Sequence, residues 1–141
     1  MAETPSKMIN LGRKAPDFNL KCVISNKFYT IQELKSEVAT VIMFICNHCP
    51  YVKLINQGLV KIANEYNVKG ISFIAINSND VESYPEDSPE NMKKIAEQLS
   101  YPFPYLFDET QEIAKLYDAA CTPDFFVFDK DLKLAYRGQF D

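Results

Sequence analysis

Residues 41–63 read VIMFICNHCPYVKLINQGLVKIA, and this stretch decides the fold. An uninterrupted apolar run, residues 41–45, ends at two closely spaced cysteines, Cys46 and Cys49. Pro50 follows the second cysteine, and the apolar residues beyond it recur at helical spacing. The pattern predicts a buried strand that ends at the entrance of a helix, with both thiols between the two elements.

A thiol at a helix entrance is well placed for chemistry. The thiolate is the reactive form of cysteine, and the free N–H groups and partial positive charge of a helix N-terminus lower the thiol pKa. Pro50 suits the first helical position, where its missing N–H costs nothing, so Cys49 becomes the N-cap residue. The sequence therefore predicts a thiol–disulfide oxidoreductase with Cys49 as its nucleophile.

The composition is that of an ordinary globular protein. The 141 residues suffice for one domain, 1–141, and 47% of them are apolar. A net charge of −4 without a basic block argues against nucleic acid or an anionic membrane as a partner. The apolar runs are far shorter than the roughly 20 residues of a membrane span, and the first residues lack a secretory apolar core, which predicts a cytoplasmic protein. Four cysteines are too few for a disulfide scaffold, so a close pair is expected to be catalytic or metal-binding.

Local patterns predict the other elements of the first half. Residues 14–34 alternate apolar and polar on either side of Ser25 and Asn26, which predicts an N-terminal β-hairpin with Cys22 as a half-buried packing thiol. Gly70 ends the first long helix, and residues 71–76 are expected to form a second buried strand, parallel to the first. The apolar stripe of that helix is Val52, Ile55, Leu59, Ile62 and Tyr66.

A polar, acidic loop, residues 77–89, leaves the carboxyl end of the second strand. This is the side of the sheet that carries the cysteines, and open α/β sheets bind ligands there. The charges of the loop are interpreted as a solvated surface. Ser88 is expected to start the next helix, whose buried stripe is Met92, Ile95, Ala96 and Leu99.

The last part of the chain is predicted to contain a hairpin. Residues 101–107 are broken by prolines and are expected to form a short extended segment instead of a central strand. After a short helix at about 110–117, residues 125–128 and 132–136 are expected to pair antiparallel. No closing helix follows, which suggests a truncated chain or a disordered tail outside the given sequence. If the helix is truly absent, the apolar positions of residues 125–136 are expected to be exposed. Such a patch would recruit a partner or a second subunit to form a homodimer.

With these residues in hand, the chain resembles the thioredoxin superfamily, specifically its peroxiredoxin-like, redoxin-type (AhpC/TSA-related) branch, from about Gly12 to Arg137. The resemblance rests on APDF at 15–18, the cysteine loop, KIANEY at 61–66 and TPDFFVFDKD at 122–131. It implies a thioredoxin-like α/β fold, in which helices flank a central mixed sheet and the N-terminal hairpin is an extension.

The resemblance also implies roles for individual residues. Counting back from the helix end that KIANEY matches puts the family's first, nucleophilic cysteine at Cys49, with Val52 in place of the usual resolving cysteine. The other register takes residues 46–49 as the C-x-x-C motif itself and needs extra residues in the helix. Thr122 and Pro123 match the family's cis-proline turn, which lies against the active cysteine and offers backbone to an extended substrate.

The resolving cysteine is left open between Cys46 and Cys121. Cys46 lies shortly upstream at a sharp turn, whereas Cys121 precedes the Thr-Pro turn, and a disulfide needs Cα atoms within about 7 Å. His48, the only histidine, either stabilises the thiolate when protonated or is a solvent-exposed loop residue. Asn47 and Pro50, within the same loop, are expected to contribute to substrate binding.

The chain departs from peroxiredoxins at their signature positions. Their P-x-x-x-T-x-x-C frame, ended on Cys49, has Ile42 at the proline and Cys46 at the threonine. Arg137, the late arginine, follows the last predicted strand and is interpreted as a surface residue. Peroxidase activity is therefore disfavoured.

Two other classes of function stay open. Cys46, His48, Cys49 and Cys121 offer soft ligands for Cu(I) or zinc, so a metal-binding protein is the alternative, and a redox-inactive interaction module is a third reading. The leading hypothesis needs no cofactor and no metal. Its partners are protein or low-molecular-weight thiols and disulfides, together with a reducing partner.

Overall fold

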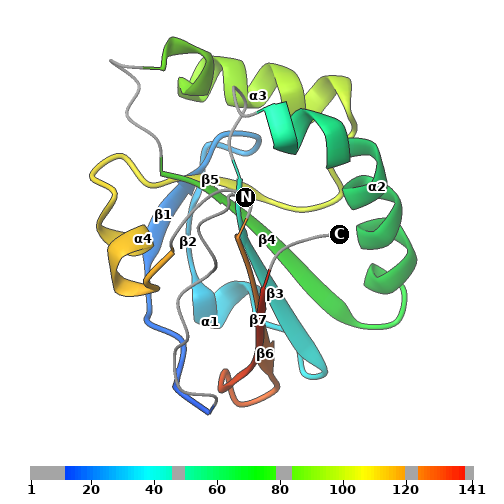
Figure 1. Cartoon of the computed structure of the whole chain (residues 1–141), viewed down its shortest axis with the longest axis vertical. Coiled ribbons are helices and arrows are strands. Elements are labelled where there is room, and N and C mark those ends of the chain that lie inside the picture. The colour runs from blue at the N-terminus through cyan, green and yellow to red at the C-terminus, as the bar shows by residue number, and fades with distance from the viewer. Residues whose placement is uncertain (1–11, 46–49, 79–83, 120–123, 139–141) are drawn as a thin grey trace.

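The computed structural model describes residues 12–45, 50–78, 84–119 and 124–138, and of residues 50–56 it describes the backbone. These parts of the chain form a seven-stranded mixed sheet with helices on both faces (Figure 1). The spatial order of the strands is β2-β1-β5-β4-β3-β6-β7. The predicted α/β architecture, with helices flanking a central mixed sheet, is confirmed.

Most elements follow the order expected from the sequence, but residues 31–34, expected within the hairpin, form a short helix, and the 3-10 turn at 85–87 was not predicted. The strands are β1 (Asn19–Cys22), β2 (Phe28–Thr30), β3 (Ala39–Phe44), β4 (Ile71–Asn77), β5 (Tyr105–Phe107), β6 (Asp124–Asp129) and β7 (Leu134–Gly138). The helices are α1 (Ile31–Leu34), α2 (Pro50–Asn67), the 3-10 turn η1 (Pro85–Asp87), α3 (Pro89–Gln98) and α4 (Glu112–Leu116). Within the described ranges, none of the helices has the length and apolar character needed to cross a membrane.

Strand β3 lies in the middle of the sheet because it is apolar on both faces. It pairs in parallel with β4, where Val41 is beside Phe73, and antiparallel with β6, where Val41 is beside Val127. The chain passes from β3 to β4 through α2, which gives the predicted parallel strand–helix–strand unit.

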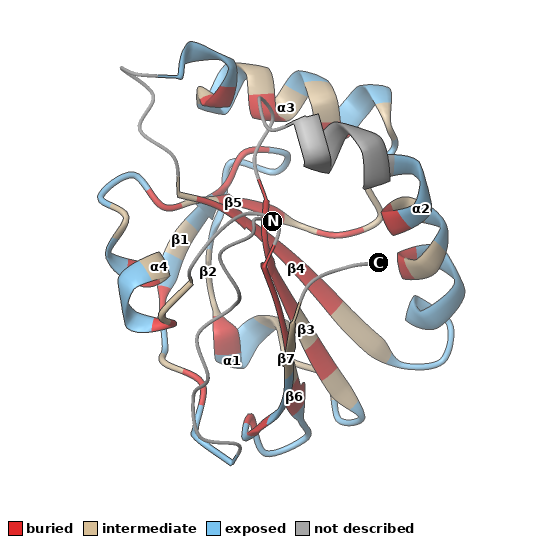
Figure 2. Cartoon of the chain, in the orientation of Figure 1, coloured by how far each residue is buried: buried red, intermediate tan, exposed pale blue. Residues whose placement is uncertain are grey.

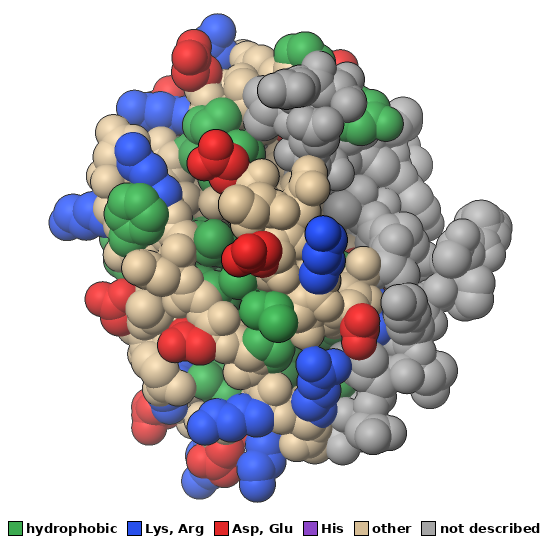
Figure 3. Space-filling view, turned by 90° about the vertical axis from the view of Figure 1, so that its left-hand side faces the viewer, with side chains coloured by type: hydrophobic (Ala, Val, Ile, Leu, Met, Phe, Trp, Pro, Cys, Tyr) green, Lys and Arg blue, Asp and Glu red, His purple; other side chains and the backbone are tan. Residues whose placement is uncertain are grey.

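The two faces of the sheet carry separate core layers, because successive strand residues point to opposite faces. Ile42 and Phe44 belong to the layer under α1 and α4, whereas Met43 and Ile45 belong to the layer under α2 and α3. Figure 2 shows the buried residues concentrated along the central strands and on the helix sides that face them. On the face shown in Figure 3, by contrast, acidic and basic side chains are interspersed.

The N-terminal hairpin is present as predicted, but it buries its cysteine more deeply. Strands β1 and β2 pair antiparallel, and Asn26 in their connection has a φ of 61°, a left-handed conformation that asparagine tolerates. Cys22 is 3% exposed instead of half-buried. The reason is that β1 also pairs with β5, so it lies inside the sheet.

Strand β5 corrects the expectation of a non-central segment. It is short, as predicted, yet it pairs in parallel with β4 and antiparallel with β1. Pro102 and Pro104 come before the paired residues, so they remove no N–H from the ladder of this strand.

The C-terminal hairpin of β6 and β7 is confirmed, but its predicted exposure is largely wrong. Tyr136 is 53% exposed, whereas most of its apolar neighbours are buried. The segment 12–15 covers part of β7: the N–H of Leu134 donates to the carbonyl of Arg13, and the N–H of Gly12 donates to that of Leu134. The buried positions are Phe125, Phe126, Phe128, Leu132 and Leu134, each at most 8% exposed.

Candidate functional site

Several strand ends meet at one end of the sheet. Phe44, the last residue of β3, pairs with Ile76 of β4 on one side and with Asp124, the first residue of β6, on the other. Asn77 at the end of β4 pairs with Phe107 at the end of β5. We call this the carboxyl end of the sheet, and it is the end at which α/β sheets bind ligands.

The predicted site residues lie outside the described residues, in the stretches 46–49 and 120–123, which we call the two gaps. Residues 46–49 follow Ile45, and residues 120–123 precede Asp124. Phe44 and Asp124, which flank the two gaps, are direct neighbours in the sheet. The predicted residues Cys46, Asn47, His48, Cys49, Cys121, Thr122 and Pro123 themselves lie outside the described residues.

The long helix begins where the sequence predicts. Helix α2 starts at Pro50 and leads the chain back to Ile71, which pairs with Ala39 at the opposite end of the sheet. The N-terminus of α2 therefore lies at the carboxyl end. Leu59 and Ala63 hold the helix against the sheet, at 3% and 0% exposure. The predicted stripe is confirmed at Leu59, while Tyr66 is 37% exposed and lies at its margin.

A buried ion pair lies at the start of β6. Nη2 of Arg137 is 2.8 Å from Oδ2 of Asp124, and the two side chains are 5% and 0% exposed. The guanidinium carbon lies 4.7 Å from the ring centroid of Phe126. The prediction that Arg137 is a surface residue is wrong, because β7 continues to Gly138 and pairs Arg137 with Phe126.

The same guanidinium has a second partner on the other side of the 120–123 gap. Nη2 of Arg137 donates to the backbone carbonyl of Asp118, just after α4. The side chain of Asp118 is also approached by Arg13, at 3.5 Å and in an exposed position. Sequence reasoning missed the pairing of Arg137 with Asp124. Counting the strand register back from the turn would not have found it, because a β-bulge between Val127 and Phe128 shifts the pairing by one residue.

A second buried polar cluster lies at the ends of β4 and β5. Nδ2 of Asn77 donates to Oδ1 of Asp87 at 2.9 Å, and both residues are fully buried. Asp108 accepts hydrogen bonds from the Ser78 hydroxyl at 2.7 Å and from the Ala114 N–H at 3.1 Å. The interpretation of the acidic loop as wholly solvated is wrong for Asp87, because η1 folds it back against β4.

A group of aromatic rings packs together at the carboxyl end of the sheet. Tyr117 packs against Phe44 and Phe126, with ring centroids 5.6 and 5.7 Å away. Its hydroxyl donates to the carbonyl of Pro16. Burial raises the pKa of the Tyr117 phenol above its ordinary value, and the Asp17 carboxylate raises it further. The Tyr117 phenol is therefore uncharged at neutral pH.

The described residues contain no metal site of their own. No group of three or more His, Cys, Asp or Glu side chains in the described ranges is arranged to hold an ion. Cys22 is a buried free cysteine in β1, which β5 and β4 separate from β3. The candidate ligands Cys46, His48, Cys49 and Cys121 fall in the gaps, and the metal-binding reading stays a prediction.

Comparison with protein families and solved structures adds to this geometry. A family model described as "AhpC/TSA family" matches residues 11–137. The crystal structure of an uncharacterized conserved protein from Geobacillus kaustophilus is 64% identical with a TM-score of 0.96, and the match covers 98% of this chain and 73% of that one. A hypothetical protein from Sinorhizobium meliloti 1021 is 43% identical with a TM-score of 0.94, over 99% of this chain and 75% of that one.

More distant structures share the fold alone. The thioredoxin domain of a thiol-disulfide oxidoreductase from Bacteroides vulgatus is 14% identical with a TM-score of 0.79, over 95% of this chain and 91% of that one. No protein with a curated description matches the chain.

Proposed function

The chain belongs to the AhpC/TSA family and has the thioredoxin-like fold, and from this premise we propose that it is a thiol–disulfide oxidoreductase whose nucleophile is Cys49. The pairing of Phe44 with Asp124 carries the proposal. It makes the described ends of both cysteine-bearing segments neighbours at the carboxyl end of the sheet. The start of α2 at Pro50 adds a helix N-terminus at the same end.

The helix supports activation of the thiol. Cys49 directly precedes Pro50, the first residue of an 18-residue helix, so the dipole and the free N–H groups of the first turn favour its thiolate. We expect the pKa of Cys49 to lie below the ~8.5 of a free thiol. A protonated His48 would lower it further.

The reaction transfers two electrons from the enzyme to a disulfide. The Cys49 thiolate attacks one sulfur of the substrate disulfide, the S–S bond breaks, and the departing thiolate takes up a proton. A mixed disulfide joins Cys49 to the substrate. The thiolate of Cys46 or Cys121 then attacks the Cys49 sulfur and releases the second substrate thiol. The enzyme disulfide that results is reduced by an external dithiol, the reducing partner.

Serine substitutions test this proposal directly. We expect Cys49→Ser to abolish insulin disulfide reduction with dithiothreitol as the electron donor, because no other thiol starts the reaction. Whichever of Cys46→Ser and Cys121→Ser accumulates the mixed disulfide identifies the resolving cysteine. Cys22→Ser is the matched control, since Cys22 lies in β1, which β5 and β4 separate from β3. Undiminished turnover in Cys49→Ser would overturn the assignment.

Family membership also favours a second candidate, a thiol peroxidase. There the Cys49 thiolate attacks a peroxide oxygen and becomes a sulfenic acid, while water or an alcohol leaves. Ile42 and Cys46 at the signature proline and threonine positions oppose it. Hydrogen peroxide consumption that depends on Cys49 and exceeds disulfide reduction would favour the peroxidase. A stoichiometric metal ion in protein purified under reducing conditions would favour the metal-binding reading instead.

A further inference from the structure

A groove opens between the N-terminal hairpin and the turn that follows β5. Its volume is about 410 Å³, and the ten residues that line it come from β1, β2, the end of β5 and the chain into α4. Its innermost residues, Asp108 and Ile113, are 1% and 9% exposed. Most of the other lining residues are exposed, so the groove is open to solvent. Figure 3 views the side of the molecule that carries β1 and α4, where apolar side chains lie among acidic and basic ones.

An exposed aromatic ring lies at the rim of this groove. Phe28 of β2 is beside Lys21 of β1, and Lys21 is beside Phe107 of β5, so the three side chains form a row on one face of the sheet. Phe28 is 60% exposed, more than any other aromatic side chain of the described residues. Aromatic rings carry much of the binding energy of protein interfaces because they bury a large apolar area. Phe28 is therefore suited to anchor a molecule that packs against the groove.

The two walls of the groove carry opposite charges. Lys21 lies on the hairpin wall, whereas Glu109 and Glu112 lie on the wall that leads into α4. All three side chains are exposed, and within the described residues none of them is in an ion pair. A ligand with a single sign of charge would be attracted by one wall and repelled by the other. The walls therefore favour an occupant that offers both signs, one on each side of an apolar contact.

We propose that this occupant is a second copy of the chain, in a two-fold symmetric dimer. A two-fold contact uses the same patch on both copies, so the patch must be complementary to itself. The rotation places the Lys21 wall of one copy against the Glu109 and Glu112 wall of the other, and Phe28 of each copy enters the groove of its partner. Ten residues line the groove, against roughly 20–30 a side in a standard interface, so the dimer is weak and reversible. The proposal does not rest on the proposed function.

This contact differs from the dimer that the sequence predicts at the hairpin of β6 and β7. Strands β2 and β7 are the two opposite edges of the seven-stranded sheet. Tyr136 of β7 is 53% exposed and does not line the groove, which makes it a matched control for Phe28. Because both rings are exposed and lie on edge strands, the removal of either one leaves the core of the protein intact.

Sedimentation of the full chain over a range of concentrations tests the proposal. It is carried out under reducing conditions, so that no disulfide joins two copies, from about 1 μM to about 1 mM. We expect Phe28→Ala to raise the Kd of the dimer by about tenfold or more, and Tyr136→Ala to leave it within about twofold of the wild type. A wild type that is monomeric at every concentration overturns the proposal and leaves the groove to a peptide or a small molecule. A dimer that Tyr136→Ala weakens and Phe28→Ala does not also overturns it.

Charge reversal provides a second test, which does not depend on the aromatic ring. Lys21→Glu makes both walls acidic, and Glu112→Lys adds a positive charge to the acidic wall, so each variant alone should dimerise about fivefold more weakly than the wild type. In a mixture of the two variants, the two reversed walls face each other and the other pair of walls keeps its attraction. We therefore expect the mixed dimer to be tighter than the dimer of either variant. Circular dichroism checks that both variants are folded, and a mixture that dimerises no better than its components overturns the proposal.

Discussion

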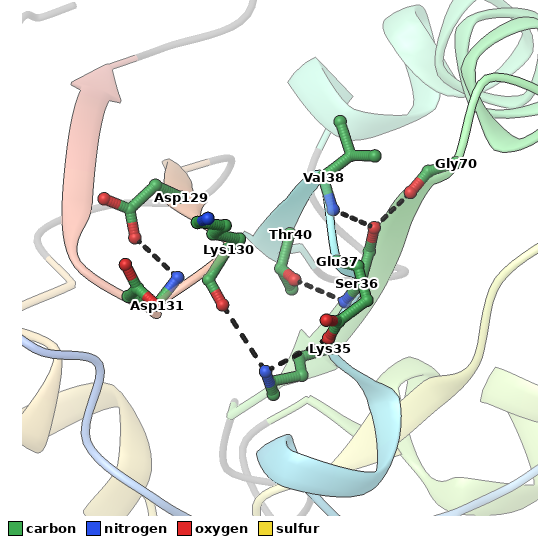
Figure 4. A network of polar contacts seen from close by, with 9 residues as sticks. All are labelled: Lys35, Ser36, Glu37, Val38, Thr40, Gly70, Asp129, Lys130 and Asp131. Carbon is green, nitrogen blue, oxygen red and sulfur yellow. Dashed lines mark hydrogen bonds and ion pairs between the residues drawn. The ribbon is translucent and has the colours of Figure 1, made fainter.

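The two ends of the central sheet differ in how deeply their polar side chains are buried. At the carboxyl end, polar side chains are buried, and each of these residues is at most 1% exposed: Asn77, Asp87, Asp108 and Asp124. At the opposite end, which we call the base, the chain turns at residues 35–40 and 129–133 (Figure 4). Most polar side chains of these two turns are exposed. Among the buried polar residues of the described chain, only Thr40 lies at the base.

Most of the polar contacts drawn at the base in Figure 4 close short turns, whereas Ser36 and Lys35 also donate to the distant carbonyls of Gly70 and Lys130. The Ser36 hydroxyl accepts from the Val38 N–H at 2.9 Å and donates to the carbonyl of Gly70. Oγ1 of Thr40 accepts from the Ser36 N–H at 3.0 Å. Asp129 accepts from two N–H groups of its own turn in the same way. Such contacts are what serine, threonine and aspartate make wherever a chain reverses direction.

The polar side chains at the carboxyl end are buried, which a chain reversal alone does not require. A buried polar group costs free energy unless it is hydrogen-bonded, so a fold tolerates it only with well-placed partners. Asp124 and Asp87 have such partners, Arg137 and Asn77, whose side chains are also buried. The comparison teaches that polar contacts hold the chain at both ends of the sheet, but that they are buried only at the carboxyl end.

Of the substitutions considered, removal of the Arg137 guanidinium should lower the free energy of unfolding most. Arg137→Met takes a charged partner from the fully buried Asp124, which should lower the free energy of unfolding by about 3–5 kcal/mol. Asp124→Leu combined with Arg137→Met should recover most of the loss, because no buried charge remains. Urea denaturation of the single and double variants measures both. A loss below about 1 kcal/mol in Arg137→Met would place this pair among ordinary surface ion pairs.

A substitution in the second buried polar cluster, that of Asn77 and Asp87, should lower the free energy of unfolding by a smaller amount. Asn77→Ala removes the amide that donates to the buried Asp87, at an expected cost of about 1–3 kcal/mol. Asn91→Ala is the control: its Nδ2 donates to the carbonyl of Pro85 at 3.0 Å in an exposed position, so the cost should stay near 0.5 kcal/mol. Equal losses in chemical denaturation would contradict the distinction between buried and exposed contacts.

Local sequence patterns were sufficient for most of the fold. The apolar run at 41–45 predicts a central strand, and β3 has that place in the sheet. Ser88 predicts a helix start, and its hydroxyl accepts from the Asn91 N–H as an N-cap. These features depend on neighbours in the sequence, so a reading of the chain finds them. The roles of Cys46 and Cys49, predicted from their spacing and from Pro50, stay a prediction because both residues lie outside the described residues.

The features that sequence reasoning missed depend on distant contacts. Arg137 changes from surface to interior because β7 begins and ends two residues later than predicted and pairs it with Phe126. Asp87 is buried because η1 returns to β4, which no local pattern encodes. Strand β5 is interior because β1 pairs with it from far away along the chain. Each of these is decided by which segments meet, and periodicity does not contain that information.

Tyr117 should make the stability of the protein depend on pH in the alkaline range. Its pKa is raised in the folded state, so above the unfolded value of about 10 the unfolded chain loses the proton first. The stability that this phenol contributes is therefore full below about pH 10 and falls as the pH rises beyond it. Tyr117→Phe should cost about 1 kcal/mol at neutral pH, through the lost hydrogen bond to Pro16, and should weaken the alkaline decline. Unfolding measured from pH 8 to pH 11 tests this, and an equally steep decline in the variant would contradict it.

Lys35 at the base makes the same kind of contact as Arg137, and it should give the smallest effect. Its Nζ lies 3.5 Å from a carboxylate oxygen of Glu37 and 3.4 Å from the carbonyl of Lys130, so a cation again joins a carboxylate to a backbone oxygen (Figure 4). The Glu37 side chain is 90% exposed, and water screens the pair. Lys35→Met should therefore lower the free energy of unfolding by less than about 0.5 kcal/mol, in a urea titration run beside Arg137→Met. Comparable losses from the two substitutions would mean that burial is not what separates the two ends, since charge and contact type are alike at both.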